Sequence, residues 1–110
     1  MATDIITTLL SIEQDLTSWF FEAHPATDAD RAALTKVLAQ RERLFQMVNK
    51  INAARVLVAA ADLAGPTADL NAESDRIKTT AKDISTAQTV LNIVANVIGI
   101  AATVLTVVGL

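Results

Sequence analysis

The chain ends in a long segment without charge. From Ile84 to Leu110 no side chain is ionisable. A helix of about 20 apolar residues is long enough to cross a hydrocarbon core of about 30 Å. The segment must therefore span a membrane or be buried in protein, and a chain of 110 residues has only a small interior in which to bury it. No other feature constrains the fold as strongly.

Composition indicates a single all-α domain over residues 1–110. Only three glycines and two prolines interrupt the chain, which favours long helices. The apolar fraction is 52% but aromatic residues supply only 4%, so we expect an aliphatic, alanine-rich core. The chain has no cysteine, which excludes disulfides and thiolate chemistry.

Apolar spacing predicts three helices. The first, over about 4–23, has a seam of five large residues spaced by four and three: Ile5, Leu9, Ile12, Leu16 and Trp19. The second, over about 27–64, begins at Thr27 with Asp30 three residues later, a weak capping box, and is expected to stop at Gly65-Pro66. The third, over about 68–110, has a large aliphatic residue at every seventh position: Leu70, Ile77, Ile84, Leu91, Ile98 and Leu105.

These helices predict an antiparallel hairpin. Residues 27–64 and 68–110 would form two long arms, with the shorter N-terminal helix packed at the base of the hairpin as a coiled-coil-like three-helix bundle. Residues 1–30 hold six acids and no base, whereas residues 31–55 hold six bases and one acid. This asymmetry favours packing of the first helix on the start of the second, although exposed ion pairs stabilise a fold only slightly.

The uncharged segment 84–110 carries more apolar surface than two neighbouring helices can cover, which predicts self-association or contact with a bilayer. The residues expected to make this contact are Val90, Ile93, Val94, Val97, Ile98, Gly99, Ile100, Val104, Leu105, Val107 and Val108. A narrow polar stripe accompanies them: Asn92, Asn96, Thr103 and Thr106. Glycine within a helix costs about 1 kcal/mol relative to alanine, so Gly99 suggests the close approach of another backbone, either the first or second helix or a copy of the C-terminal helix.

Further features are consistent with a membrane. Lys78 and Lys82 directly precede the apolar segment, as basic flanking residues often do, and Ala95, Gly99 and Thr103 form a ridge of small residues suited to helix pairing in lipid. Long helices that conceal an apolar segment resemble the α-helical pore-forming toxins in general architecture, without a shared motif. That resemblance implies a soluble form that inserts into membranes.

The aromatic cluster Trp19-Phe20-Phe21 has two interpretations. Trp19 and Phe20 fit the core of the first helix, whereas Phe21 should point away from it. The cluster is then either a hydrophobic plug at one end of the bundle or an anchor at the level of lipid headgroups.

Residues for catalysis are scarce. His24 is the only histidine, and no Gly-rich phosphate loop, nucleophile elbow or zinc spacing is present. We therefore expect no enzymatic activity, no catalytic residue, no cofactor and no metal. The formal net charge of −3 argues against nucleic acid as a partner. The N-terminus shows no Sec-type leader, and the cellular compartment is not indicated.

Two functions remain open at this point. In the first, a non-enzymatic, self-associating helical protein, with itself or a related helical protein as its partner, inserts its C-terminal helix into a bilayer. In the second, the protein is a structural or adaptor coiled coil whose C-terminal helix stays permanently buried.

Overall fold

The computed structural model describes residues 2–54 and 64–107, except for the side chains of residues 2–4 and 54. Within these ranges the chain is helical and contains no strand, which confirms the predicted all-α class. The elements are α1 (Ala2–Glu22), α2 (Asp28–Ala54), α3 (Ala64–Thr79), the 3-10 turn η2 (Ile84–Thr86) and α4 (Ala87–Val107).

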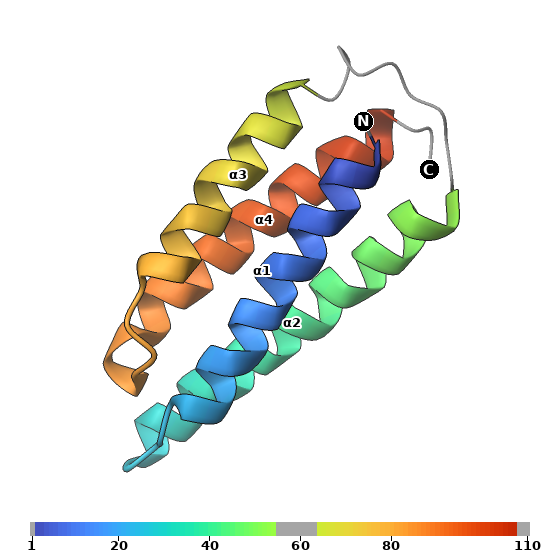
Figure 1. Ribbon diagram of the computed structural model, residues 1–110. Coiled ribbons are helices and arrows are strands. Elements are labelled where there is room, and N and C mark those ends of the chain that lie inside the picture. The colour runs from blue at the N-terminus through green and yellow to red at the C-terminus, as the bar shows by residue number, and fades with distance from the viewer. Residues whose placement is uncertain (1, 55–63, 108–110) are drawn as a thin grey trace.

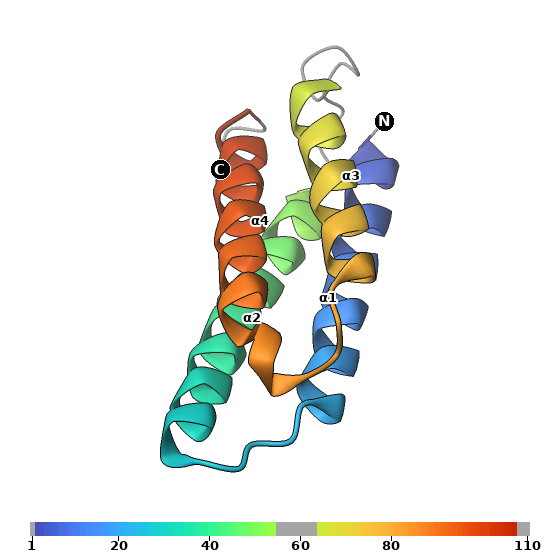
Figure 2. The same cartoon turned by 90° about the vertical axis from the view of Figure 1, so that its left-hand side faces the viewer.

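The helices form two antiparallel hairpins that pack into a four-helix bundle (Figure 1). One hairpin consists of α1 and α2, and the other of α3 and α4. The hairpins meet through α2 against α4, the most extensive helix contact, and through α1 against α3. Both of these pairs run parallel, because the chain direction alternates from each helix to the next (Figure 2).

The predicted third helix over 68–110 is wrong, because it breaks between Thr79 and Ile84. The Thr80 hydroxyl donates to the Arg76 carbonyl (2.7 Å), and the Thr80 amide donates to the Ile77 carbonyl (3.3 Å). Such bonds satisfy carbonyls at a helix C-terminus and compete with continuation of the helix. The chain then reverses direction, which produces a fourth helix and replaces the predicted three-helix arrangement.

The Gly65-Pro66 pair lies inside the first turn of α3 and does not mark the predicted helix stop. Proline is tolerated in a first helical turn because the amide it lacks would have no partner there. The predicted extension of the second helix over residues 55–63 lies outside the described residues, and Ala64 belongs to α3.

The predicted start of the second helix is confirmed. The Asp30 amide donates to the Thr27 hydroxyl (3.1 Å), and the Thr27 amide donates back to the Asp30 carboxylate (3.3 Å). This reciprocal pair is a capping box in which aspartate takes the place of the usual glutamate.

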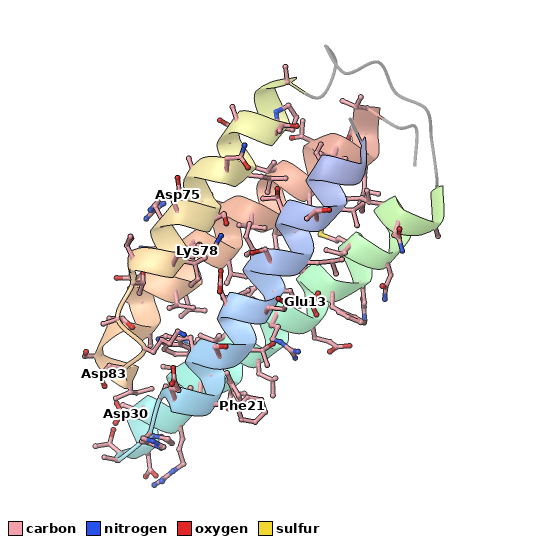
Figure 3. All side chains as sticks on the ribbon, in the orientation of Figure 1. Glu13, Phe21, Asp30, Asp75, Lys78 and Asp83 are labelled. Carbon is pink, nitrogen blue, oxygen red and sulfur yellow. The ribbon has the colours of Figure 1, made fainter. Side chains whose placement is uncertain are left out.

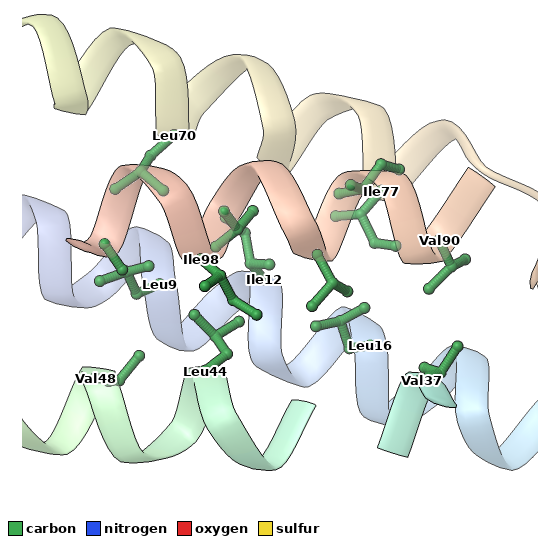
Figure 4. Packing of buried hydrophobic residues seen from close by; sticks show 14 of the residues in the cluster. Leu9, Ile12, Leu16, Val37, Leu44, Val48, Leu70, Ile77, Val90 and Ile98 are labelled. Atoms are coloured by element: carbon green, nitrogen blue, oxygen red, sulfur yellow. The ribbon is translucent and has the colours of Figure 1, made fainter. Parts of the chain in front are cut away.

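The core is almost entirely aliphatic (Figure 4), with Trp19 as its one buried aromatic residue. The buried face of α4 is not centred on the predicted seven-residue series, since Leu91 and Leu105 are only partly buried. It is made by the neighbouring positions Ala87, Val90, Ile93, Val94, Val97, Ile98, Ala101 and Val104. Because the helix breaks before α4, a seven-residue spacing counted from α3 does not stay in register in α4. The predicted series therefore falls on the flank of α4 and not on the centre of its buried face.

Glu13 is an exception in this core. Its side chain faces the seam between α1 and α2 (Figure 3), is only 7% exposed, and has an oxygen, Oε2, without a hydrogen-bond partner. Burial raises the pKa of Glu13 above its ordinary value of 4.5, and the nearby positive charge of Arg41 opposes this effect. The charged form of Glu13 is therefore disfavoured by the fold.

We expect Glu13→Gln to stabilise the protein by roughly 1 kcal/mol at neutral pH, because it removes an incompletely compensated buried charge. The raised pKa means that the folded state binds the Glu13 proton more tightly, so the wild type loses stability as the pH rises from 4.5 through the folded pKa. The difference between variant and wild type should vanish below pH 4.5. Urea unfolding of both proteins across this range measures it, and an equal difference at every pH would contradict the account.

Candidate functional site

The segment Ile84–Val107 is the one stretch of the described chain that is long and apolar enough to cross a membrane. Its 24 residues would extend about 36 Å if fully helical, against about 30 Å for a hydrocarbon core. Length and composition alone do not distinguish such a span from a buried helix. The two faces of α4 therefore decide what it can do.

The inward face of α4 holds most of the residues for which we predicted contact with a partner or a membrane. Ile100 and Leu105 are partly buried, and Val107 is 40% exposed. Val108 lies outside the described residues. The remaining large members of the set are buried within the single chain: Val90, Ile93, Val94, Val97, Ile98 and Val104. The apolar surface that α4 leaves exposed is thus smaller than expected, because the break in the predicted third helix produces a fourth helix that helps to enclose the core.

The outward face of α4 is uncharged and consists mainly of small or polar residues. All four members of the predicted polar stripe lie on it: Asn92, Asn96, Thr103 and Thr106. The other exposed residues are Gln88, Thr89, Ala95, Gly99, Ala102 and Val107. We call these ten positions the α4 outer face.

Hydrogen bonds within α4 satisfy much of the polarity of the α4 outer face. Gln88 Nε2 donates to Asn92 Oδ1 (3.1 Å), and the hydroxyls of Thr103 and Thr106 donate to carbonyls one turn earlier in the helix (3.1 and 3.0 Å). Polar side chains paired in this way can enter an apolar environment at a reduced cost.

Gly99 lies on the α4 outer face in open space. A Cβ atom added there would meet nothing within 4 Å. Among the described residues no helix of the same chain approaches Gly99 closely, so of the two predicted possibilities the copy of the C-terminal helix stays a prediction. Close packing at Gly99 remains available only to a second molecule or to lipid.

A shallow groove of about 410 Å³ separates α4 from α3. Asn96 Nδ2 of α4 donates to Glu73 Oε1 across it (3.3 Å), and Glu73 also pairs with Arg76 (3.1 Å). Asp69 and Ala72 of α3 line the same groove opposite Gly99. The groove thus places acidic side chains along one edge of the α4 outer face.

The turn of the α3–α4 hairpin is fastened to α1 through Trp19. The indole Nε1 donates to the Thr86 hydroxyl (2.9 Å) and to the Asp83 carbonyl (3.2 Å), and the ring is 1% exposed. Lys82 reinforces this attachment with an ion pair to Glu22 (3.6 Å). These contacts join the two hairpins in addition to the aliphatic packing between them.

The aromatic cluster divides as predicted. Trp19 is buried, Phe20 packs partly against the core, and Phe21 is 74% exposed (Figure 3). Phe21 is therefore the only member of the cluster that is free to contact a bilayer. The buried role of Trp19 in fastening the hairpins was not visible in the sequence, since its partners lie more than 60 positions away.

No group of three or more His, Cys, Asp or Glu side chains within residues 2–54 and 64–107 is arranged to hold a metal ion. His24, the only histidine of the chain, is exposed in the turn between α1 and α2. No protein-family model, curated protein or solved structure matches the chain. A function must therefore be inferred from the chemistry of α4.

Proposed function

We propose that this chain is a non-enzymatic, membrane-active helical protein that self-associates through α4 and releases α4 into lipid bilayers. One observation carries this proposal: α4 is uncharged on its exposed face as well as on its buried face. Both α2 and α3 expose charged side chains to water, as solvent-facing helices usually do. A helix that lacks charge on every side can move into lipid without burying an ion.

Release of α4 would exchange one apolar environment for another. Its buried aliphatic side chains pack against the core in the bundle and would contact acyl chains in a membrane. Its outer face would then meet the outer face of another α4, because paired Asn and Thr side chains and small residues favour helix contacts in lipid. Release would have to open the hydrogen bonds of Trp19 to Asp83 and Thr86 and the hydrogen bond between Asn96 and Glu73.

Release of a trapped dye from lipid vesicles tests this proposal. Vesicles of phosphatidylcholine alone, and of phosphatidylcholine mixed with phosphatidylglycerol, should leak on addition of the protein. Leakage should rise more steeply than linearly with protein concentration if several copies act together. Intact vesicles of both compositions at micromolar protein would contradict the proposal.

The second candidate is a structural or adaptor protein in which α4 never leaves the bundle. The observation that favours it is the extensive packing of α4 on α2, with eight buried residues on α4. Under this alternative vesicles remain intact, while α4 stays protected from hydrogen exchange in the presence and absence of lipid.

A further inference from the structure

We infer that the α4 outer face binds a second copy of this chain, with α4 packed against α4 about a two-fold axis parallel to both helices. This inference deepens the self-association in the proposed function, because it assigns the partner and its orientation. It rests on the small residues of the face together with an independent feature, the opposite charges along its two edges.

Small residues make close packing on this face possible. Ala95, Gly99 and Ala102 are exposed, and nothing fills the space above Gly99. Two helices with such residues at their contact can bring their backbones close together. The face is also free of charge, so that its burial against an identical face desolvates no ion.

One edge of the face is basic. Lys36, Arg43 and Lys50 of α2 are all exposed and lie at intervals of seven residues, so they share one side of α2. Arg41 marks the opposite flank, since its Nε donates to Thr17 of α1 (2.9 Å). Arg43 follows Arg41 by two residues, which corresponds to a rotation of about 200° around the helix. Lys36, Arg43 and Lys50 therefore lie on the flank of α2 that faces away from α1 and adjoins α4.

The other edge is acidic. Asp69 and Glu73 lie one turn apart on the side of α3 that lines the α3–α4 groove, and Asn96 of α4 bonds to Glu73 (3.3 Å). Arg76 offsets the charge of Glu73 through an ion pair (3.1 Å), so the net negative charge of this edge comes from Asp69. The α4 outer face is therefore an uncharged strip with bases along its α2 edge and acids along its α3 edge.

These edges select one orientation of the two copies. A two-fold axis parallel to α4 places the α2 edge of each copy over the α3 edge of the other. The levels also correspond: Leu44 lies at the level of Ile98 along the bundle (Figure 4), which puts Arg43 near the level of Asn96 and its partner Glu73. A two-fold axis perpendicular to α4 would instead place bases over bases and acids over acids, which is unfavourable.

Sedimentation of charge-reversed variants tests this interface. One variant carries Arg43→Glu and Lys50→Glu, and the other carries Asp69→Lys and Glu73→Lys. We expect each variant alone to dimerise at least about tenfold more weakly than the wild type, because the two edges then repel. An equimolar mixture of the two should recover most of the affinity, since each reversed edge meets its complement.

Any of three results would overturn the inference. They are a wild-type chain that sediments at its monomer mass of 11.7 kDa throughout the micromolar range, reversed variants that dimerise like the wild type, or a mixture without recovery. Circular dichroism verifies that each variant is folded. If the contacts of Glu73 are needed for folding, the single substitution Asp69→Lys replaces the double variant. Asp69 is exposed, and reversing its charge should weaken the dimer in the same direction.

Gly99→Leu supplies an uncharged test of the same surface. The added side chain has room within the monomer and should not lower its melting temperature, but it should obstruct the approach of a second α4 and raise the dimer dissociation constant about tenfold or more. Gly99→Ala is the matched control and should keep most of the affinity. A Gly99→Leu variant that dimerises like the wild type would contradict packing at this face.

These measurements contain no lipid, so their outcome is independent of the vesicle experiment. A dimer that responds to the edges but leaves vesicles intact would reject membrane activity and retain the interface. Leakage by a chain that stays monomeric would reject the interface and retain membrane activity.

Discussion

Trp19→Ala should destabilise the fold by about 3–5 kcal/mol, the range observed when a large buried aromatic side chain is truncated. Trp19 is the largest fully buried side chain of the protein, and it also donates to Asp83 and Thr86 in the segment that leads into α4. Its loss would leave a cavity and detach this segment from α1. Urea unfolding followed by far-UV circular dichroism measures the change.

Trp19→Phe is the matched control, because it keeps an aromatic ring and removes the indole donor. We expect it to cost about 1–3 kcal/mol, from lost volume and from one hydrogen-bonding group. Its vesicle leakage should be faster than that of the wild type, since the hairpins are less firmly joined. A loss below about 1 kcal/mol for Trp19→Ala would show that Trp19 does not fasten the hairpins.

Ala95→Lys should abolish vesicle leakage at protein concentrations where the wild type is active. Ala95 is exposed and lies near the middle of Ile84–Val107, so lysine should be tolerated in the four-helix bundle but would lie near the bilayer centre after insertion. Lysine at that depth costs about 2.5–3.5 kcal/mol on insertion scales, which corresponds to about a 60- to 300-fold weaker insertion equilibrium.

Ala32→Lys is the control for that substitution. It makes the same exchange at an exposed position of α2, outside the segment proposed to insert, and should leave leakage within about twofold of the wild type because surface substitutions usually have small effects. Melting temperatures of both variants verify that the four-helix bundle is intact. Equal leakage by Ala95→Lys and the wild type would exclude α4 as the inserting helix.

The fold class, the presence of the first helix and the start of the second helix could be predicted because local signals specify them. The capping box at Thr27 and the apolar seam of α1 operate over a few residues, and both appear in the structure. The break after Thr79 was missed because no glycine or proline marks it. Its determinants are hydroxyl bonds to backbone carbonyls and the indole of Trp19, a contact made across more than 60 residues.

That missed break also affected the prediction for α4. With one continuous helix, Val90, Ile93 and their neighbours exceeded the surface that two helices could cover. With four helices they form the wall of a closed core. The polar stripe was located correctly from spacing alone, because Asn92 and Thr103 lie within one unbroken helix. The charged edges could not be predicted, since they depend on which flanks of α2 and α3 adjoin α4.

The depth of α4 in a bilayer tests the central claim most directly. The chain has no cysteine, so Ala95→Cys places a single thiol for an environment-sensitive fluorophore, and Ala32→Cys provides the matched site on α2. With vesicles present, the probe at position 95 should be shielded from aqueous iodide and quenched by nitroxides near the bilayer centre, while the probe at position 32 stays accessible to iodide. Iodide access at position 95 that does not change when vesicles are added would contradict insertion of α4.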